Sequence, residues 1–256
     1  MRTAIAVAIA IVAFAAALIF LAPASLLDAR LAAISDGRVR IANAEGTLWH
    51  GSGDLVLSAA GTRRPVGWRI DAWPLLRGEL RGSFTGSADS QRIGTFDASG
   101  DKLELHGIEL AVPMETLLRT LGAPSLLASA GGEVTLRVDR LVRGADTLDA
   151  QLGLLWSNAS LPSQRPDLRI ALGDVRAELS GQGREVPGTI QNSGGDVDLR
   201  GTLSAAANGS ARVDLQVKPR AGLARDRADA IATALGLIGS PDGQGGYRVA
   251  WAGRPR

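Results

Sequence analysis

The chain has 256 residues and no cysteine. Without cysteine it cannot form disulfides, thiolate zinc sites or iron–sulfur clusters, and it has no thiol nucleophile. Aromatic residues are also few, at 4 % of the chain with one tyrosine and four phenylalanines. Such a chain lacks the stacking platforms that single-stranded nucleic acids need. What remains is a globular composition, with 45 % hydrophobic and 21 % charged residues.

Charge is not concentrated in any part of the sequence. The 28 basic and 26 acidic residues leave a net charge of only +2. The lysines are Lys102 and Lys218, and the arginines are scattered among apolar and polar residues without forming a run. Scattered arginines are typical of a solvated face, so we expect no contact with nucleic acid.

Residues that carry catalysis or bind metals are scarce too. The histidines are His50 and His106, and neither has the H-E-x-x-H or H-x-x-E-H spacing of a metal site. The nucleophile elbow G-x-S-x-G and the phosphate-binding G-x-x-x-x-G-K-[ST] are absent from the sequence. We interpret the glycine pairs at 51–53 and 181–183 as hairpin turns. The sequence thus predicts no catalytic residue, no cofactor and no metal site.

Several aspartates alternate with apolar residues, namely Asp139, Asp149, Asp174, Asp196 and Asp198. In a strand this alternation points the carboxylates at water, which is the interpretation we favour. The alternative is a pair of carboxylates that act as acid and base in an envelope hydrolase, and no spacing in the sequence supports it.

The one long apolar run spans residues 4–22, nineteen residues without charge, glycine or proline. As a helix it would extend about 28 Å, close to the ~30 Å hydrocarbon core of a bilayer. Arg2 precedes the run, and the positive flank favours a cytoplasmic N-terminus. We therefore expect residues 1–24 to form a cytoplasmic flank and a transmembrane anchor. Residues 25–256 would then form a domain in the periplasm of a Gram-negative bacterium.

A cleaved signal peptide is the alternative for the apolar run. Residues 22–24, Ala-Pro-Ala, offer the small side chains of a cleavage site. Proline beside the scissile bond is a poor context for cleavage, however, and the run exceeds the usual apolar core of about 7–15 residues. The length favours a retained single span in the inner membrane, and the domain is exported under either interpretation.

Beyond the run, apolar and polar residues alternate with period two, as Val134, Leu136 and Val138 do. Glycine, serine, asparagine and aspartate separate the alternating stretches, which favours an antiparallel sheet. The pattern predicts strands at 39–44, 54–59, 66–71, 102–111, 133–141, 147–156, 168–179, 195–203, 211–217 and 247–251.

Two stretches have helical spacing instead. Residues 113–121 begin with a proline, which suits the first turn of a helix. In 224–238 apolar residues recur at steps of three and four, and Gly239 follows as a terminator. The predicted fold is therefore mainly β. It has one N-terminal transmembrane helix followed by a largely antiparallel, curved sheet with two short helices.

Trp49, Trp68 and Trp73 lie within 25 residues of one another just beyond the apolar run. Tryptophans favour either the core or the membrane interface, where the indole N–H finds a partner. We favour the core for these three residues. The alternative is a surface that lies against lipid or another membrane subunit.

Two motifs follow the apolar run, GTLWHGSG at 46–53 and WRIDAWPLLRGEL at 68–80. In this order after one N-terminal span, they resemble protein N of the bacterial type II secretion system. The resemblance continues in order along the chain, at 155–159, 172–175, 239–243 and 246–249. The residues that carry it are Gly46, Thr47, Leu48, Trp49, Gly51, Trp68, Leu75, Leu76, Gly78, Trp156, Gly173, Gly243 and Tyr247.

The resemblance implies a non-catalytic accessory subunit that supports the export of folded periplasmic proteins across the outer membrane. Its implied partners are other inner-membrane subunits of the secretion machine. The residues themselves leave another function open, a membrane-anchored periplasmic carrier or conduit for lipid or another apolar ligand. This alternative rests on long strands rich in leucine, valine and isoleucine with few aromatics to fill a core.

Overall fold

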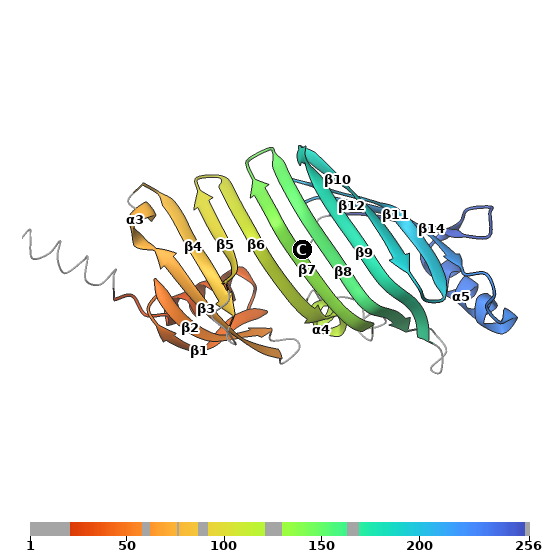
Figure 1. Ribbon diagram of the computed structural model, residues 1–256, viewed down its shortest axis with the longest axis horizontal. Coiled ribbons are helices and arrows are strands. Elements are labelled where there is room, and N and C mark those ends of the chain that lie inside the picture. The colour runs from red at the N-terminus through yellow and green to blue at the C-terminus, as the bar shows by residue number, and fades with distance from the viewer. Residues whose placement is uncertain are drawn as a thin grey trace, which may run out of the picture. The chain divides into compact units, whose positions relative to one another are not determined.

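The chain forms two compact units, Met1–Thr95 and Phe96–Arg256 (Figure 1). This computed structural model describes residues 21–57, 62–75, 77–86, 92–120, 130–162 and 169–253. No helix within these ranges is long and apolar enough to cross a membrane. The predicted anchor at 4–22 lies almost wholly outside the described residues.

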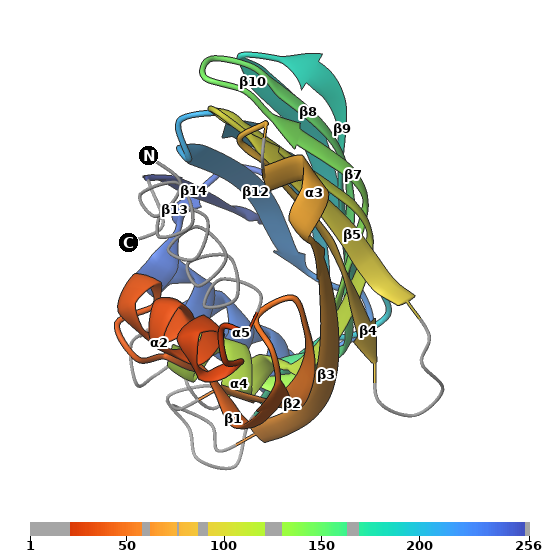
Figure 2. The same cartoon turned by 90° about the vertical axis from the view of Figure 1, so that its left-hand side faces the viewer.

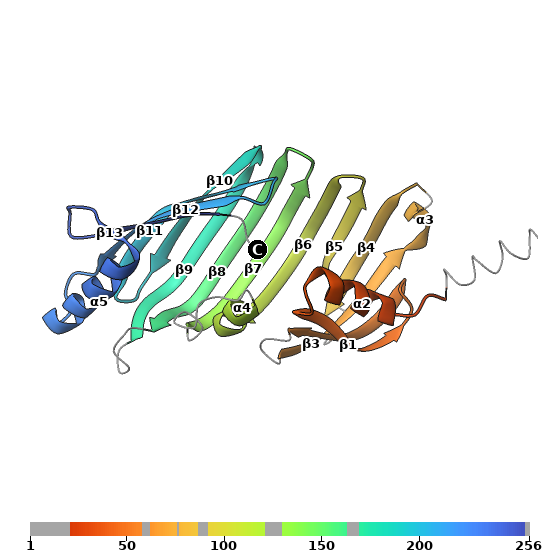
Figure 3. The same ribbon diagram turned by 180° about the vertical axis from the view of Figure 1, so that it is seen from behind.

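The first unit is an antiparallel sheet in the order β1-β2-β3-β4, with α2 packed beside β1 (Figure 3). Strand β5 (Arg92–Ser99) crosses the division between the units. The other elements are α2 (Ser25–Ile34), β1 (Val39–Gly46), β2 (His50–Leu57), β3 (Thr62–Asp71), α3 (Ala72–Leu75) and β4 (Glu79–Gly86).

The core of the first unit forms around Trp68, whose side chain packs with Ala24 and Ile41. Leu27 and Leu31 of α2 pack against this cluster. Positions 24, 27 and 31 fall on one face of a helix, which explains why α2 turns this face towards the sheet.

The second unit is an antiparallel sheet in the order β6-β7-β8-β9-β10-β11-β12-β14-β13. Strands β7, β8 and β9 are long, with 13, 15 and 15 residues. The elements are β6 (Lys102–Pro113), α4 (Met114–Thr120), β7 (Gly131–Arg143), β8 (Leu148–Pro162), β9 (Arg169–Gly183), β10 (Glu185–Ser193), β11 (Val197–Ala206), β12 (Ala211–Pro219), α5 (Arg225–Ile238), β13 (Ser240–Pro241) and β14 (Tyr247–Gly253).

The sheet of the second unit is curved, with β12 and β14 turned back relative to β7 and β8 (Figure 2). Helix α5 packs on the inner face of this curve through Ile231 and Leu235, which are buried one turn apart. They contact a cluster that includes Val175, Leu199 and Val217 from three strands. A second buried cluster, around Val186 on β10, lies on the same sheet.

The mainly β, antiparallel architecture is confirmed, and the predicted helices at 113–121 and 224–238 correspond to α4 and α5. The expectation of two short helices was wrong, because the described residues contain four. Pro113 ends β6, pairing with Glu133, so helix α4 starts at Met114 and not at the proline. Residues 51–53 lie within β2, not in a turn, whereas Gly183 does end β9 at the hairpin into β10.

Candidate interaction site

The first motif forms the tight turn between β1 and β2. Gly46 pairs with Gly51 across the turn, and Gly46 has a φ of +89°, a conformation that glycine adopts most easily. Thr47 closes the turn, since its N–H donates to the carbonyl oxygen of His50 at 2.9 Å. Its hydroxyl oxygen accepts the N–H of His50 at 3.2 Å. The threonine therefore holds the turn from its side chain and its backbone.

Trp68 of the second motif locks this turn from β3. Its indole N–H donates to the carbonyl oxygens of Thr47 and Leu48, at 3.2 and 3.1 Å. Its ring lies over Gly51, its partner in the register of β2 and β3. Trp68 is 3 % exposed, so the two motifs of the sequence build one buried contact.

The same turn holds the residues that follow the apolar run. The N–H of Leu48 donates to the carbonyl oxygen of Ala22 at 2.8 Å, and the N–H of Ala24 donates to that of Gly46 at 3.3 Å. Between these bonds Pro23 forms an isolated bridge with Thr47. The turn and residues 22–24 are therefore one hydrogen-bonded structure.

The three clustered tryptophans occupy different environments. The core interpretation is confirmed for Trp68, and Trp49 is half-buried, with its carbonyl oxygen accepting the N–H of Ile70 at 2.6 Å. It is wrong for Trp73, which is 80 % exposed on α3. Leu75 on the same helix is also exposed. We call these two exposed apolar residues, Trp73 and Leu75, the α3 patch.

Two further motif residues flank the α3 patch. Leu76 lies outside the described residues. Gly78 has a φ of +76° and its N–H donates to the carbonyl oxygen of Leu75 at 3.0 Å. Because a β-carbon there would meet no atom within 4 Å, the glycine serves the backbone conformation and not a close contact.

The later motif residues lie in the second unit and have structural roles. Trp156 donates its indole N–H to the carbonyl oxygen of Gly131 at 2.9 Å. Gly173 has a φ of +74° and approaches Ser193 so closely that a β-carbon would lie 2.1 Å from its carbonyl oxygen. Tyr247 packs against the cluster under α5.

Gly243 lies in the turn before β14, where the carboxylate of Asp242 accepts the N–H groups of Gln244 and Gly246 at 2.7 and 2.9 Å. These bonds hold the pKa of Asp242 below its usual value. Gly243 itself has a φ of +77°. The motif at this end of the chain therefore specifies a turn.

Asp196 departs from the prediction that its carboxylate faces water. It is buried just before β11, where it accepts the N–H of Ala171 at 2.8 Å and an Arg227 Nη2 hydrogen bond at 2.7 Å. Burial raises the pKa of this carboxyl, but the bonds from Arg227 and Ala171 outweigh that effect and lower it overall. Asp196 thus ties α5 to the sheet.

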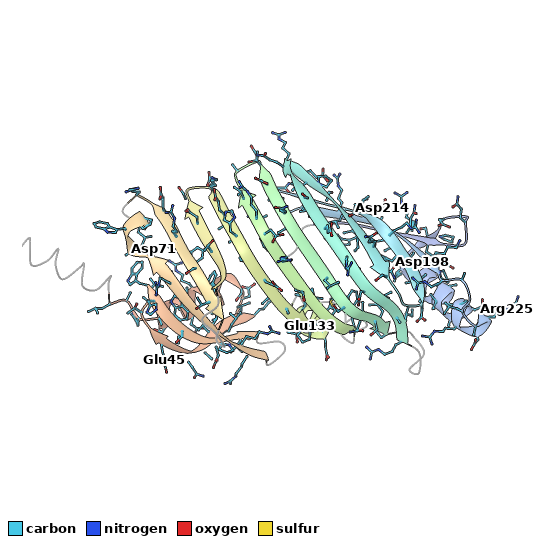
Figure 4. The ribbon with its side chains drawn as sticks, in the orientation of Figure 1. Glu45, Asp71, Glu133, Asp198, Asp214 and Arg225 are labelled. Atoms are coloured by element: carbon cyan, nitrogen blue, oxygen red, sulfur yellow. The ribbon has the colours of Figure 1, made fainter. Side chains whose placement is uncertain are left out.

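The other four aspartates are more accessible, and two are half-exposed ion-pair partners in the second unit. Asp149 lies 3.1 Å from Arg140. Asp198, which Figure 4 labels, lies on β11 at 2.7 Å from Arg220. Asp139 and Asp174 likewise have partners, the guanidinium of Arg137 and the N–H of Asn158.

The two histidines lie in different units. His50 is exposed at the start of β2, and His106 on β6 lies 3.4 Å from Glu104. Lys102 and, more weakly, His106 lower the pKa of Glu104 by hydrogen bonding. Across the described ranges, no group of three or more histidine or acidic side chains is arranged to hold a metal ion.

A cavity of about 590 Å³ lies over β10, β11, β12 and β14. Its lining includes both apolar and charged side chains, and the charged ones have partners. Glu185 lies 3.8 Å from Arg212 and accepts a hydrogen bond from Ser204, and Asp214 is paired with Arg248. The Arg248 contact lowers the pKa of Asp214, so this pair stays ionised at neutral pH.

Comparison with known proteins decides the family. A sequence model described as "Type II secretion system (T2SS), protein N" matches residues 37–250. The chain belongs to this family. One relative, the type II secretion system protein N of Aeromonas hydrophila, is 25 % identical over 252 residues, which are 96 % of each chain. No solved structure matches the chain. The resemblance predicted from the motifs is thus confirmed.

Membership of the protein N family makes the chain a component of a protein-transport machine. The family match includes the turn between β1 and β2 that Trp68 holds, which we call the locked turn, and the beginning of β14. What sequence reasoning missed was the structural role of Asp196. The available signal was its position next to Gly194 and Gly195, at the beginning of the predicted strand at 195–203.

Proposed function

We propose that the chain is a non-catalytic accessory subunit of the type II secretion system, anchored in the inner membrane by residues 4–22. Its β-rich part, from residue 25 onward, lies in the periplasm and supports the export of folded proteins across the outer membrane. The observation that carries this proposal is the locked turn. It belongs to the family match region and binds residues 22–24, which follow the apolar run directly.

The locked turn supports a retained anchor over a cleaved leader. Residues 22–24 are held by two backbone hydrogen bonds and one bridge, so they are built into the first unit. A helix leaving the membrane at this point has no free linker before the folded unit. The anchor therefore confines the domain to a thin layer beside the bilayer, which raises its effective concentration for other anchored subunits.

A non-catalytic role fits the chemistry of the described residues. The acidic side chains that could have formed an acid and base pair instead hold the sheet together, as Asp196 does with Arg227. The acidic side chains that line the cavity, Glu185 and Asp214, are likewise paired with arginines. We therefore assign the function to contacts with other subunits.

The α3 patch is our candidate for such a contact. Trp73 is 80 % exposed, and large exposed aromatic residues are enriched at protein interfaces and at the membrane interface. The absence of cysteine makes the test direct, because one introduced thiol is unique. The full chain with W73C, treated in intact envelopes with a short thiol-reactive crosslinker, should attach to another subunit of the secretion machine.

The matched control for this crosslinking is L237C, since Leu237 is similarly exposed but lies on α5 in the second unit. A secretion subunit attached through W73C and not through L237C supports the proposal. If neither position captures a secretion subunit while both thiols react with a maleimide, the proposed contact is wrong.

A second function, the lipid carrier, is favoured by one feature of the second unit. Leu110, Leu136 and Leu154 lie side by side on β6, β7 and β8, on the same face of the sheet as the buried Val134. Leu110 is 39 % exposed and the other two are half-buried. An uncovered row of leucines is chemically suited to acyl chains.

Native mass spectrometry of the full chain after detergent exchange tests this second function. Reproducible bound lipid that falls with L154Q, but not with L155Q on the opposite face of the same strand, would support a carrier. A bare polypeptide would leave the accessory subunit as the better account.

A further inference from the structure

Helix α2 carries apolar residues on two opposite sides. One side packs against the buried cluster around Trp68 through Leu27 and Leu31 (Figure 3). A helix on the surface of a soluble unit usually turns charged and polar residues to the solvent on its opposite side. The exposed side of α2 instead consists of Ser25, Leu26, Ala29 and Ala33. None of these side chains is charged, and only the serine is polar.

The charged residues of α2 lie at the borders of this exposed side. Asp28 is turned to the sheet, where its carboxylate accepts the N–H of Ile41 at 2.8 Å and pairs with Arg40. Arg30 is exposed on the other border, and it has no hydrogen bond or ion pair with any residue that the structure describes. The guanidinium of Arg30 is therefore available to an anion outside the chain.

The beginning of α2 is held beside the end of the apolar run. Ala22 ends the run, and its carbonyl oxygen accepts the N–H of Leu48 at 2.8 Å. Pro23 lies in the bridge with Thr47, so the backbone is extended there and the run and α2 are separate segments. Between Ala22 and the first residue of α2 the chain extends at most about 10 Å. With residues 4–22 across the bilayer, α2 therefore begins at the membrane surface.

We propose that the exposed side of α2 lies on the phospholipid bilayer of the inner membrane, with Leu26, Ala29 and Ala33 against the acyl chains. This inference rests on the retained anchor of the proposed function. The anchor places the bilayer beside α2 in every copy of the chain, and burial of apolar side chains at the lipid boundary holds such helices in the membrane plane. Arg30 extends from the border of the helix to the lipid phosphates, which its guanidinium binds through two parallel hydrogen bonds.

This position orients the first unit. Leu27 and Leu31 pack on the sheet from the side of α2 that faces away from the bilayer, so α2 lies between the lipid and the sheet. The face of the sheet remote from α2 is then turned to the periplasm. Arg63 lies on that remote face, since it pairs with Val56, whereas the neighbouring Leu55 packs against the same cluster as α2.

Nitroxide labels test this orientation on the full chain, which has no native cysteine. L26C, A29C and A33C are labelled one at a time, and each protein is reconstituted into vesicles of phosphatidylethanolamine and phosphatidylglycerol. Electron paramagnetic resonance gives the collision rate of each label with oxygen, which enters lipid, and with a water-soluble nickel chelate, which does not. The nickel rate at these positions should be several-fold lower than at R63C, the matched control, because Arg63 is exposed on the remote face of the same sheet.

The contact assigned to Arg30 has its own test. In the L26C background, R30E sets a carboxylate against the lipid phosphates, whereas R30K keeps a positive charge. Both replacements are good helix formers at an exposed position, so the helix is retained. The nickel rate at L26C should rise several-fold with R30E and stay near its original value with R30K. Equal rates for the two variants would contradict the phosphate contact.

Flotation of the same vesicles distinguishes this inference from the anchor on which it rests. A chain that floats with the vesicles, but whose labels on α2 meet nickel as often as the label at R63C, overturns the inference and leaves the anchor in place. A chain that remains in the lipid-free fraction contradicts the anchor and overturns the inference with it. Flotation together with low nickel rates on α2 is the result expected.

Discussion

The indole ring of Trp68 lies so close to Gly51 that a β-carbon on Gly51 would be 2.5 Å from its Cζ2 atom. The two residues are partners in the register of β3 and β2. One belongs to each of the two motifs that carry the family resemblance. The two motifs therefore occur together because the Trp68 ring stabilises the turn between β1 and β2, and because only a glycine at position 51 leaves room for that ring.

G51A should therefore destabilise the protein by about 1–3 kcal/mol, because the added methyl forces the buried ring or the turn to move. G153A is the matched control, since Gly153 lies in β8 and a β-carbon there meets no atom within 4 Å. Denaturant unfolding monitored by tryptophan fluorescence measures both variants. Equal free energies of unfolding for the two would contradict the close contact.

W68F keeps most of the ring but removes the N–H that serves Thr47 and Leu48. We expect a loss of about 1–2 kcal/mol, because two buried carbonyl groups lose a donor. Hydrogen exchange should show faster exchange at Leu48 and Ala24, whose N–H groups join the turn to residues 22–24. Unchanged exchange at both amides would mean that the indole N–H does not hold the turn.

Asp196 should make stability depend on acid pH. Its folded pKa is lowered, so its stabilising contribution is complete above the unfolded carboxyl pKa of about 3.9 and is lost as pH falls through the folded value. D196N should therefore be destabilised by about 1–3 kcal/mol at pH 7, and its difference from wild type should shrink below about pH 4.

D139N is the control for this pH series, because Asp139 and its partner Arg137 are both exposed on β7. It should change the free energy of unfolding by less than about 0.5 kcal/mol. A difference between D196N and wild type that stays constant from pH 7 to pH 3 would show that the charge of Asp196 is not what stabilises α5.

A substitution in the α3 patch should change secretion without changing the stability of the protein. W73A removes a side chain that is 80 % exposed, so unfolding should change by less than about 0.5 kcal/mol. If the patch contacts another subunit, the same variant should reduce secretion several-fold at unchanged protein level. Normal secretion by W73A would remove the patch as an interface.

Alternation was enough to predict the strands that carry large apolar residues on one face. It failed for β10, where Pro187 and Gly188 interrupt the pattern. Gly188 is required there because a β-carbon would lie 2.3 Å from the carbonyl oxygen of Glu178 on β9. It failed for β4 as well, since Gly82 occupies a core-facing position opposite Ile70. Where two strands approach closely, a glycine occupies the position of a hydrophobic side chain. The alternation is then interrupted, and the sequence resembles that of a turn.

The locked turn could be located from sequence, but its contacts could not. Gly46 and Thr47 are ordinary turn residues, whereas the partner of the turn, Trp68, is 21 residues away from Thr47. Likewise the spacing of Asp196 and Arg227 gives no sign that they meet. Long-range pairs follow from the register of the whole sheet, which no local pattern contains.

The most direct test of the central proposal is secretion by a strain that lacks this chain. A substrate of the type II system should accumulate in the periplasm of the deletion strain, and the full chain supplied from a plasmid should return it to the medium. G51A, which breaks the locked turn, should restore secretion less well than G153A. Normal amounts of substrate in the medium of the deletion strain would contradict the account.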